Sequence, residues 1–220
     1  ACGGAAALAG VIVLGAREGR FGKKGEPKSL VPFAASSIPL VTLGTFFLWF
    51  GWFGFNGFSQ LAMGTFDDVT AITKIAVNTH LAGAAGVVTG AVVTRLLDSK
   101  TDVVMMLNGA LAGLVAITAE PLSPTPGLAI LIGSLGSLIM YFGTKFLERR
   151  GLDDVVGAIP VHMFAGIFGT LIVPFSNADT SFGTQFTGVL AICSFSFILS
   201  FIIFKILKAT VGLRISKEAE

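Results

Sequence analysis

The sequence predicts an all-α integral membrane protein that crosses a bilayer several times, and three observations predict this class. Of the 220 residues, 53% are apolar and only 13% are charged, with a mean hydropathy of +0.83, whereas soluble domains carry about 25% charged residues. The charged residues gather in short segments that are separated by long uncharged stretches. These stretches approach the roughly 20 residues with which a helix crosses the hydrocarbon core while satisfying its own backbone polar groups.

Seven apolar segments follow from these stretches. The first, residues 1–16, is apolar from its first residue and lacks an initiator Met, a cap and a basic leader. We therefore interpret it as the second part of a span and expect the chain to be a fragment of a longer protein. The six complete spans are expected at about 34–61, 72–94, 103–119, 127–147, 155–175 and 184–208.

The loops between these segments alternate in positive charge. Fourteen of the 15 Lys and Arg residues fall on one side of the predicted membrane, and Lys74 alone falls on the other side. The positive-inside rule places the rich side in the cytoplasm, together with the C-terminus. The sequence thus predicts a multi-pass protein of the cell membrane. Because the formal net charge is only +2 and the basic residues lie in loops, nothing indicates a nucleic-acid partner.

Small residues within the spans predict how the helices pack. Close backbone approach packs helices in lipid, where no hydrophobic force drives them together. We expect plain bundle packing at most of the recurring glycines, which include Gly83, Gly86, Gly90, Gly109, Gly113, Gly133 and Gly136. Cys2 and Cys193 lie in apolar stretches without disulfide or metal spacing, which favours small buried thiols. No metal, cofactor or enzymatic centre is expected.

One histidine stands inside a predicted span. His162 lies in GAIPVHMFAGIFG, and an ionisable group at that depth usually faces a cavity or a partner. Pro160 removes a backbone donor just before it and can kink the helix. The competing interpretation is a core histidine whose hydrogen bonds are satisfied. Asp153 and Asp154 precede the span, where aspartate is a natural helix cap. Asp154 lies roughly 12 Å from His162 along a helix, so direct contact is not expected.

The second span carries a dense aromatic segment, LWFGWFGFNGFS at residues 48–59. Its aromatic faces attract cations, most strongly when they are desolvated, and Asn56 and Ser59 add hydrogen-bonding groups toward the outer end. An aromatic belt with lipid contact is the alternative interpretation. His80, the other histidine, is expected roughly 9 Å inside the outer end of its span. It is expected either at the interface or paired with one of the preceding aspartates, and nothing places it in a pore.

Taken together, these motifs resemble the ammonium transporter family, which includes the Amt, MEP and Rh proteins. The motifs follow the family's order and spacing over essentially the whole chain: GGAAALAGVIVLGAR at 3–17, GWFGFN at 51–56, VNT at 77–79, NGALAGLVAITA at 108–119, DDVVGAIPVH at 153–162 and TVGLR at 210–214. The resemblance implies an eleven-helix protomer whose first ten helices form two inverted repeats with the substrate path between them. Residues 1–220 would then be a partial ammonium transporter domain, with the end of helix 5, helices 6 to 10 and the long helix 11, or about 6.5 transmembrane helices.

The resemblance also implies roles for individual residues. His162 resembles the second of two pore histidines, the first of which would fall immediately before Ala1. Phe55 resembles one ring of a phenylalanine gate, and Ser59 resembles the serine that accepts from ammonium at the outer mouth. Asp154 matches an aspartate with a structural role. The residues that resemble pore-lining positions are Leu48, Trp52 and Ile159.

The implied function is transport of ammonium or ammonia through a hydrophobic pore. A bare ammonium ion in hydrocarbon costs on the order of tens of kcal/mol, so we expect deprotonation near the gate and separate movement of ammonia and proton along the histidine-lined pore. The resemblance implies a homotrimer, and a PII-type regulatory protein at the cytoplasmic face is a candidate partner. The alternatives are an ammonium sensor coupled to signalling and a helix bundle without a pore. We expect residues 1–220 alone to form no sealed pore.

Overall fold

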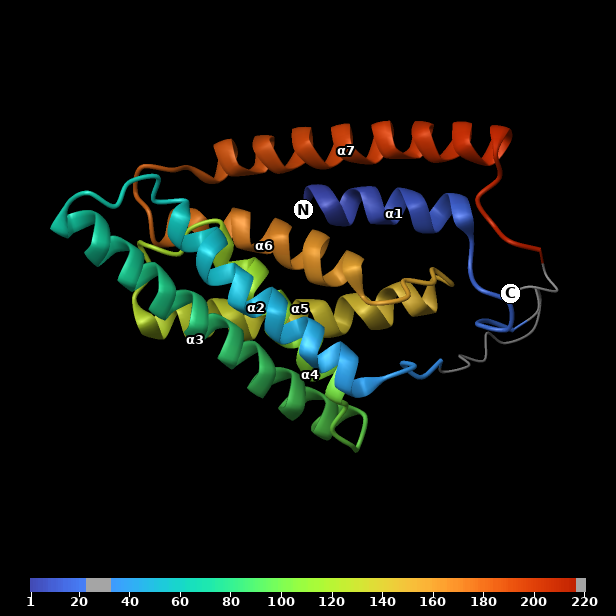
Figure 1. The fold of residues 1–220 in the computed structure, drawn as a ribbon, viewed down its shortest axis with the longest axis horizontal. Helices are drawn as coiled ribbons and strands as arrows, with labels where there is room; N and C mark the ends of the chain where they lie inside the picture. Colours follow the sequence, from blue (N-terminus) through green and yellow to red (C-terminus); the bar gives the residue numbers. More distant parts are fainter. Residues whose placement is uncertain (23–32, 217–220) are drawn as a thin grey trace.

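The computed structural model describes residues 1–22 and 33–216, and the regular elements in these ranges are all helical (Figure 1). In chain order they are α1 (Cys2–Leu14), α2 (Ile38–Phe58), α3 (Phe66–Leu97), α4 (Val103–Thr118), α5 (Pro126–Arg149), the π-helix η1 (Ile159–Phe164), α6 (Ala165–Ile172), the 3-10 turn η2 (Val173–Phe175) and α7 (Phe182–Thr210). The predicted all-α fold is confirmed. Lys23, Lys24, Lys28 and Lys217, which contribute to the charge asymmetry, lie outside the described residues.

Four of the described helices, α2, α3, α5 and α7, are long and apolar enough to cross a membrane. Three further apolar segments are shorter: α1, α4 and the combined segment Ile159–Phe175. The observed helix ends differ from the predicted ends where a side chain caps the helix. α3 begins at Phe66 rather than at 72, because Thr65 and Asp68 form a reciprocal capping box. Hydropathy and charge had placed Asp68 in a loop, whereas its charge supports the first turn of the helix.

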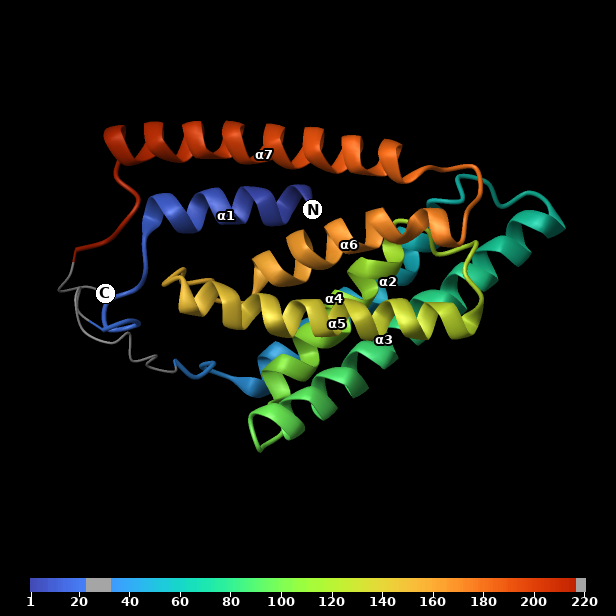
Figure 2. The same ribbon diagram turned by 180° about the vertical axis from the view of Figure 1, so that it is seen from behind.

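Three helices, α3, α4 and α5, pack side by side and form the centre of the bundle (Figure 2). Glycines bring their backbones into contact. A side chain at Gly86 would collide with the carbonyl of Gly109, and a side chain at Gly133 would collide with the backbone of Ala82. The Ser137 hydroxyl adds a buried hydrogen bond to the Gly86 carbonyl (2.9 Å). Direct backbone contact of this kind is how helices pack without a hydrophobic force between them.

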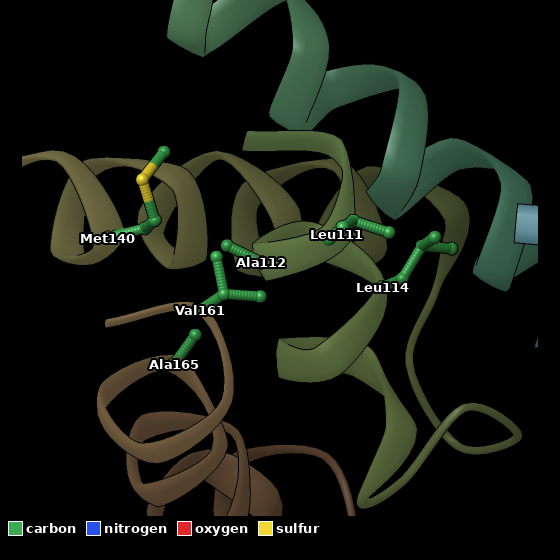
Figure 3. Packing of buried hydrophobic residues seen from close by; sticks show 6 residues of the cluster. All are labelled: Leu111, Ala112, Leu114, Met140, Val161 and Ala165. Atoms are coloured by element: carbon green, nitrogen blue, oxygen red, sulfur yellow. The ribbon is translucent and has the colours of Figure 1, made fainter. Parts of the chain in front are cut away.

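A cluster of buried apolar side chains joins this centre to the segment that carries His162. Figure 3 shows its members, which are at most 9% exposed: Leu111, Ala112 and Leu114 of α4, Met140 of α5, Val161 of η1 and Ala165 of α6. Val161 directly precedes His162, and Ala165 follows three residues later. The backbone on both sides of the histidine is therefore fixed by packing.

Helices α1 and α7 lie beside each other on one flank of the bundle (Figures 1 and 2). The Lys208 ammonium donates to the Val13 carbonyl (2.6 Å), and the Cys2 thiol lies 2.8 Å from the Ser196 hydroxyl. Both cysteines are free thiols, with Cys2 exposed and Cys193 half-buried. The prediction of a buried thiol is therefore wrong for Cys2, which lies in the first turn of α1.

Candidate transport site

His162 lies in η1, a π-helical segment of six residues that runs directly into α6. π-Helical turns occur mostly as single turns within α-helices and are frequent at functional sites. Val161 N–H donates to the Gly157 carbonyl (3.2 Å), whereas Pro160 has no N–H to donate. The His162 ring is half-buried and makes no hydrogen bond within residues 1–22 and 33–216. The hydrogen bonds that would satisfy a core histidine are therefore not found among the described residues.

The turn before His162 is fixed by Asp154. Its Oδ1 accepts from the Ala158 N–H (3.0 Å) and its Oδ2 accepts from the Ile159 N–H (2.7 Å). These bonds satisfy two of the free backbone donors at the start of the helix, which is the capping role that the sequence predicted. Gly157, with φ of 76°, makes the turn, and a side chain there would meet the Asn108 amide nitrogen at 2.7 Å. Asp154 thus holds the segment that carries His162 through hydrogen bonds to its backbone.

The neighbouring Asp153 makes a contact that the sequence analysis missed. The Arg17 backbone N–H and Nε donate to Asp153 Oδ2 (2.9 and 2.8 Å), and Arg17 Nη2 donates to Oδ1 (2.9 Å). Burial alone would raise the pKa of Asp153, whose side chain is 2% exposed, but the bonds from Arg17 hold this pKa below its ordinary value. The same pairing raises the pKa of Arg17. The loop before His162 is therefore tied to the chain that follows α1.

One face of α2 carries four of the predicted site residues. Leu48, Trp52, Phe55 and Ser59 follow one another at spacings of four, three and four, which places them on the same side of a helix. Leu48 is 52% exposed and Phe55 is 65% exposed, Ser59 is exposed, and Trp52 is half-buried. The described residues leave most of this face uncovered, so it is available to a further part of the protein or to a pathway along it.

The polar groups of this face have defined directions. The Ser59 hydroxyl donates to the Phe55 carbonyl (2.7 Å), one turn earlier. Its hydrogen is therefore used, while its lone pairs remain free to accept. Trp52 Nε1 donates to the Thr118 hydroxyl of α4 (2.7 Å), which in turn donates to the Leu114 carbonyl (2.6 Å). These bonds fix the indole of Trp52 against α4.

Two further sequence-based expectations concern residues away from this face of α2. Ile159, predicted to line a pore, is fully buried, so its side chain packs inside the described bundle. His80 lies near the middle of α3, not near its outer end, because this helix begins earlier than predicted. Its ring stands 5.6 Å from Trp49 and is stacked on Phe53 at 6.2 Å between centroids. Its suggested aspartate partner Asp68 is engaged in the capping box instead.

These features define a class: a multi-pass α-helical membrane protein with uncovered aromatic and polar groups along one helix and a histidine in a π-helical turn. Comparison with known proteins then gives the family. The model of the Ammonium Transporter Family matches residues 1–220, and the chain belongs to this family. The resemblance noted from the sequence motifs is thereby confirmed.

Individual relatives agree with this assignment. Over its whole length the chain is 41% identical to ammonium transporter Amt2 of Archaeoglobus fulgidus, of which it covers 50%. It is 37% identical to a putative ammonium transporter of Synechocystis over 97% of the chain and 40% of the relative. The chain spans about half the length of the curated relatives it matches, as expected for part of a longer family member.

Solved structures show the same fold. The chain superposes on a Sensor Amt Protein with a TM-score of 0.90 and 34% identity, covering 99% of this chain and 55% of that protein. It superposes on Mep2 of Candida albicans with a TM-score of 0.83 and 26% identity, over 99% of this chain and 50% of that one. The membrane fold predicted from the sequence is thus confirmed.

Proposed function

We propose that this chain supplies part of the wall of a pathway that carries ammonium or ammonia across the cell membrane. The observation that carries the proposal is the arrangement of Phe55 and Ser59 on the uncovered face of α2. The Ser59 hydroxyl donates its hydrogen to the Phe55 carbonyl. Toward the open side it therefore offers lone pairs, which can accept from ammonium, a cation that has only donors. Aromatic faces next to it replace part of the cation's water shell.

Beyond this mouth, the apolar surroundings favour neutral ammonia over ammonium, because a desolvated cation is costly there. We assign His162 to the proton: its ring has no hydrogen bond within the described residues, and a neutral imidazole can accept or pass a proton near working pH. Asp154 acts at a distance, as the cap that holds this segment. Leu48 and Trp52 line the path with Phe55, whereas the fully buried Ile159 packs behind it.

Uptake of methylammonium by the full-length protein tests these roles. Ser59→Ala should raise the apparent KM roughly tenfold, the cost of one hydrogen bond to a charged group, and Ser59→Thr should preserve it. Phe55→Ala should weaken discrimination against potassium, with Phe46→Ala on the opposite face of α2 (59% exposed) as its control. His162→Ala should lower uptake by about 100-fold or more, and His80→Ala should leave it unchanged. Unchanged uptake and conductance in His162→Ala would remove this residue from the mechanism.

The alternative of an ammonium sensor has no separate support. The similarity to a Sensor Amt Protein covers the same residues that match Mep2, so it does not distinguish the two functions. The curated relatives are named as transporters, which favours transport over enzymatic chemistry.

We further propose the assembly and orientation that the sequence suggested. The C-terminus lies in the cytoplasm, since the basic loops gather on its side. The protein forms a homotrimer, and a PII-type regulator binds the same side. Protease protection of a C-terminal tag in sealed vesicles tests the orientation, and the mass of the purified protein in detergent tests the trimer.

A further inference from the structure

Besides the rings of Trp49 and Phe53 on His80, the contact between α2 and α3 includes two van der Waals contacts without a preferred direction. The indole of Trp49 fills the notch at Gly83, where an added Cβ would meet Trp49 Cζ2 at 2.8 Å. Farther along, the position of a Cβ on Gly57 lies in ordinary contact with Ile72, at 3.6 Å. Such van der Waals contacts hold two helices together but tolerate sliding and rotation.

A single hydrogen bond between these points has a fixed direction. Asn56 Nδ2 of α2 donates to Thr79 Oγ1 of α3 at 2.9 Å. The two side chains are 1% and 0% exposed. Asn56 Oδ1 is buried and has no hydrogen-bond partner among the described residues. The pair therefore lies in the dry interior of the helix contact and is only half satisfied.

Such a pair is a poor way to gain stability. A buried amide oxygen without a partner costs free energy, and a leucine of similar size would fill the same space without that cost. Buried polar groups of this kind are best attested as devices that specify helix register. The Asn56–Thr79 bond can form at only one rotation and one axial position of α2 against α3.

That rotation decides where the neighbouring side chains point. Phe55 precedes Asn56 and lies about 100° round the helix from it, and Ser59 continues the face of Phe55 one turn later. Phe55 is 65% exposed, so packing in the described chain does not fix its direction. Trp52 is also hydrogen-bonded to Thr118, but Trp52 belongs to the proposed pathway itself.

We infer that Asn56 and Thr79 are positioning residues: their buried hydrogen bond sets the rotation of α2 and thereby the places of Phe55 and Ser59. This inference rests on the proposed function of that face. Neither residue reaches the pathway, so variants at these positions change the orientation of α2 without changing the chemistry along it.

The test uses Thr79→Val in the full-length protein, which keeps the shape of the side chain and removes its hydroxyl. We expect the apparent KM for methylammonium to rise roughly fivefold, the worth of one hydrogen bond, and discrimination against potassium to weaken, at unchanged protein amount. Thr79→Ser should restore both values. The matched control is Thr45→Val: Thr45 is also buried on α2, but its hydroxyl bonds only to the Val41 carbonyl of the same helix (3.0 Å).

A second variant guards against a simple folding defect. Asn56→Leu/Thr79→Val removes both polar groups, so it should reach at least the wild-type amount and still show the raised KM. The inference is wrong if Thr79→Val behaves like Thr45→Val, or if uptake falls only in proportion to protein amount. Phe55→Ala and Ser59→Ala distinguish the proposed function from the positioning role. Normal transport in both variants would overturn the proposed function. Altered transport in both, together with normal transport in Thr79→Val, would overturn only the positioning role.

Discussion

Helices α5 and α2 have nearly the same hydropathy and very different surroundings. Their most apolar windows have mean hydropathies of 1.7 and 1.6, yet 44% of the α5 window is buried inside the structure and only 6% of the α2 window. α7 shares the low burial of α2, at 6%. In lipid, an apolar surface does not reveal whether it meets another helix or the bilayer.

Glycine contacts separate the two helices where hydropathy does not. Within α5, a side chain at Gly133 would collide with Ala82, and a side chain at Gly136 would meet the Ala112 carbonyl at 2.8 Å. Within α2, nothing lies within 4 Å of a Cβ placed on Gly44 or Gly51. Gly133 and Gly136 of α5 thus allow helix contact, whereas Gly44 and Gly51 of α2 have open space beside them.

The largest loss of stability is expected where valine replaces a packed glycine of α5. The same replacement at an open glycine of α2 tests the comparison. Gly133→Val in α5 should destabilise the full-length protein by about 3 kcal/mol or more, because backbone cannot yield to the new side chain. Gly51→Val in α2 should be far milder, limited to the lower helix preference of valine. Heat-induced and SDS-induced unfolding in detergent measures both variants. Equal losses would show that α2 is packed as tightly as α5 in the complete protein.

A smaller loss of stability is expected at Asp153, which receives three hydrogen bonds from Arg17. Asp153→Asn should cost about 1–2 kcal/mol, since bonds to a charged group are lost but Arg17 is 36% exposed and screened by solvent. The exposed Asp67→Asn serves as control.

The pH dependence of this effect has a definite sign. The pKa of Asp153 is lowered in the folded protein, so the carboxylate stabilises the fold above the ordinary pKa of aspartate. This contribution is lost as the pH falls through the lowered, folded-state pKa. The melting temperatures of wild type and Asp153→Asn should therefore converge in acid. A constant difference down to that range would contradict the ion pair.

The sequence predicts features that depend on neighbouring residues, and it misses contacts between residues that lie far apart along the chain. The helices follow from uncharged stretches, but the start of α3 depends on a capping box that includes Asp68, a charge that hydropathy assigns to a loop. The shared face of Phe55 and Ser59 follows from their spacing of four residues. The partners Asn56 and Thr79, or Arg17 and Asp153, lie on different segments, and only the packed fold brings them together. The single available hint was the pair of adjacent aspartates, of which one suffices as a cap.

The smallest change in unfolding free energy is expected when isoleucine is replaced by valine, a change that removes one methylene group and can be made in both α5 and α7. Ile132 of α5 is 3% exposed and Ile202 of α7 is 49% exposed. Ile132→Val should cost about 1 kcal/mol, because the lost methyl leaves a void among packed neighbours. Ile202→Val should change the unfolding free energy by less than about 0.5 kcal/mol, because a lipid chain fills the space as well as the methyl did. An equal cost at Ile202 would show that a protein surface, from the rest of the chain or a second subunit, covers α7 in the assembled protein. Uncovered helices such as α2 and α7 would then mark where the missing contacts of the complete protein lie.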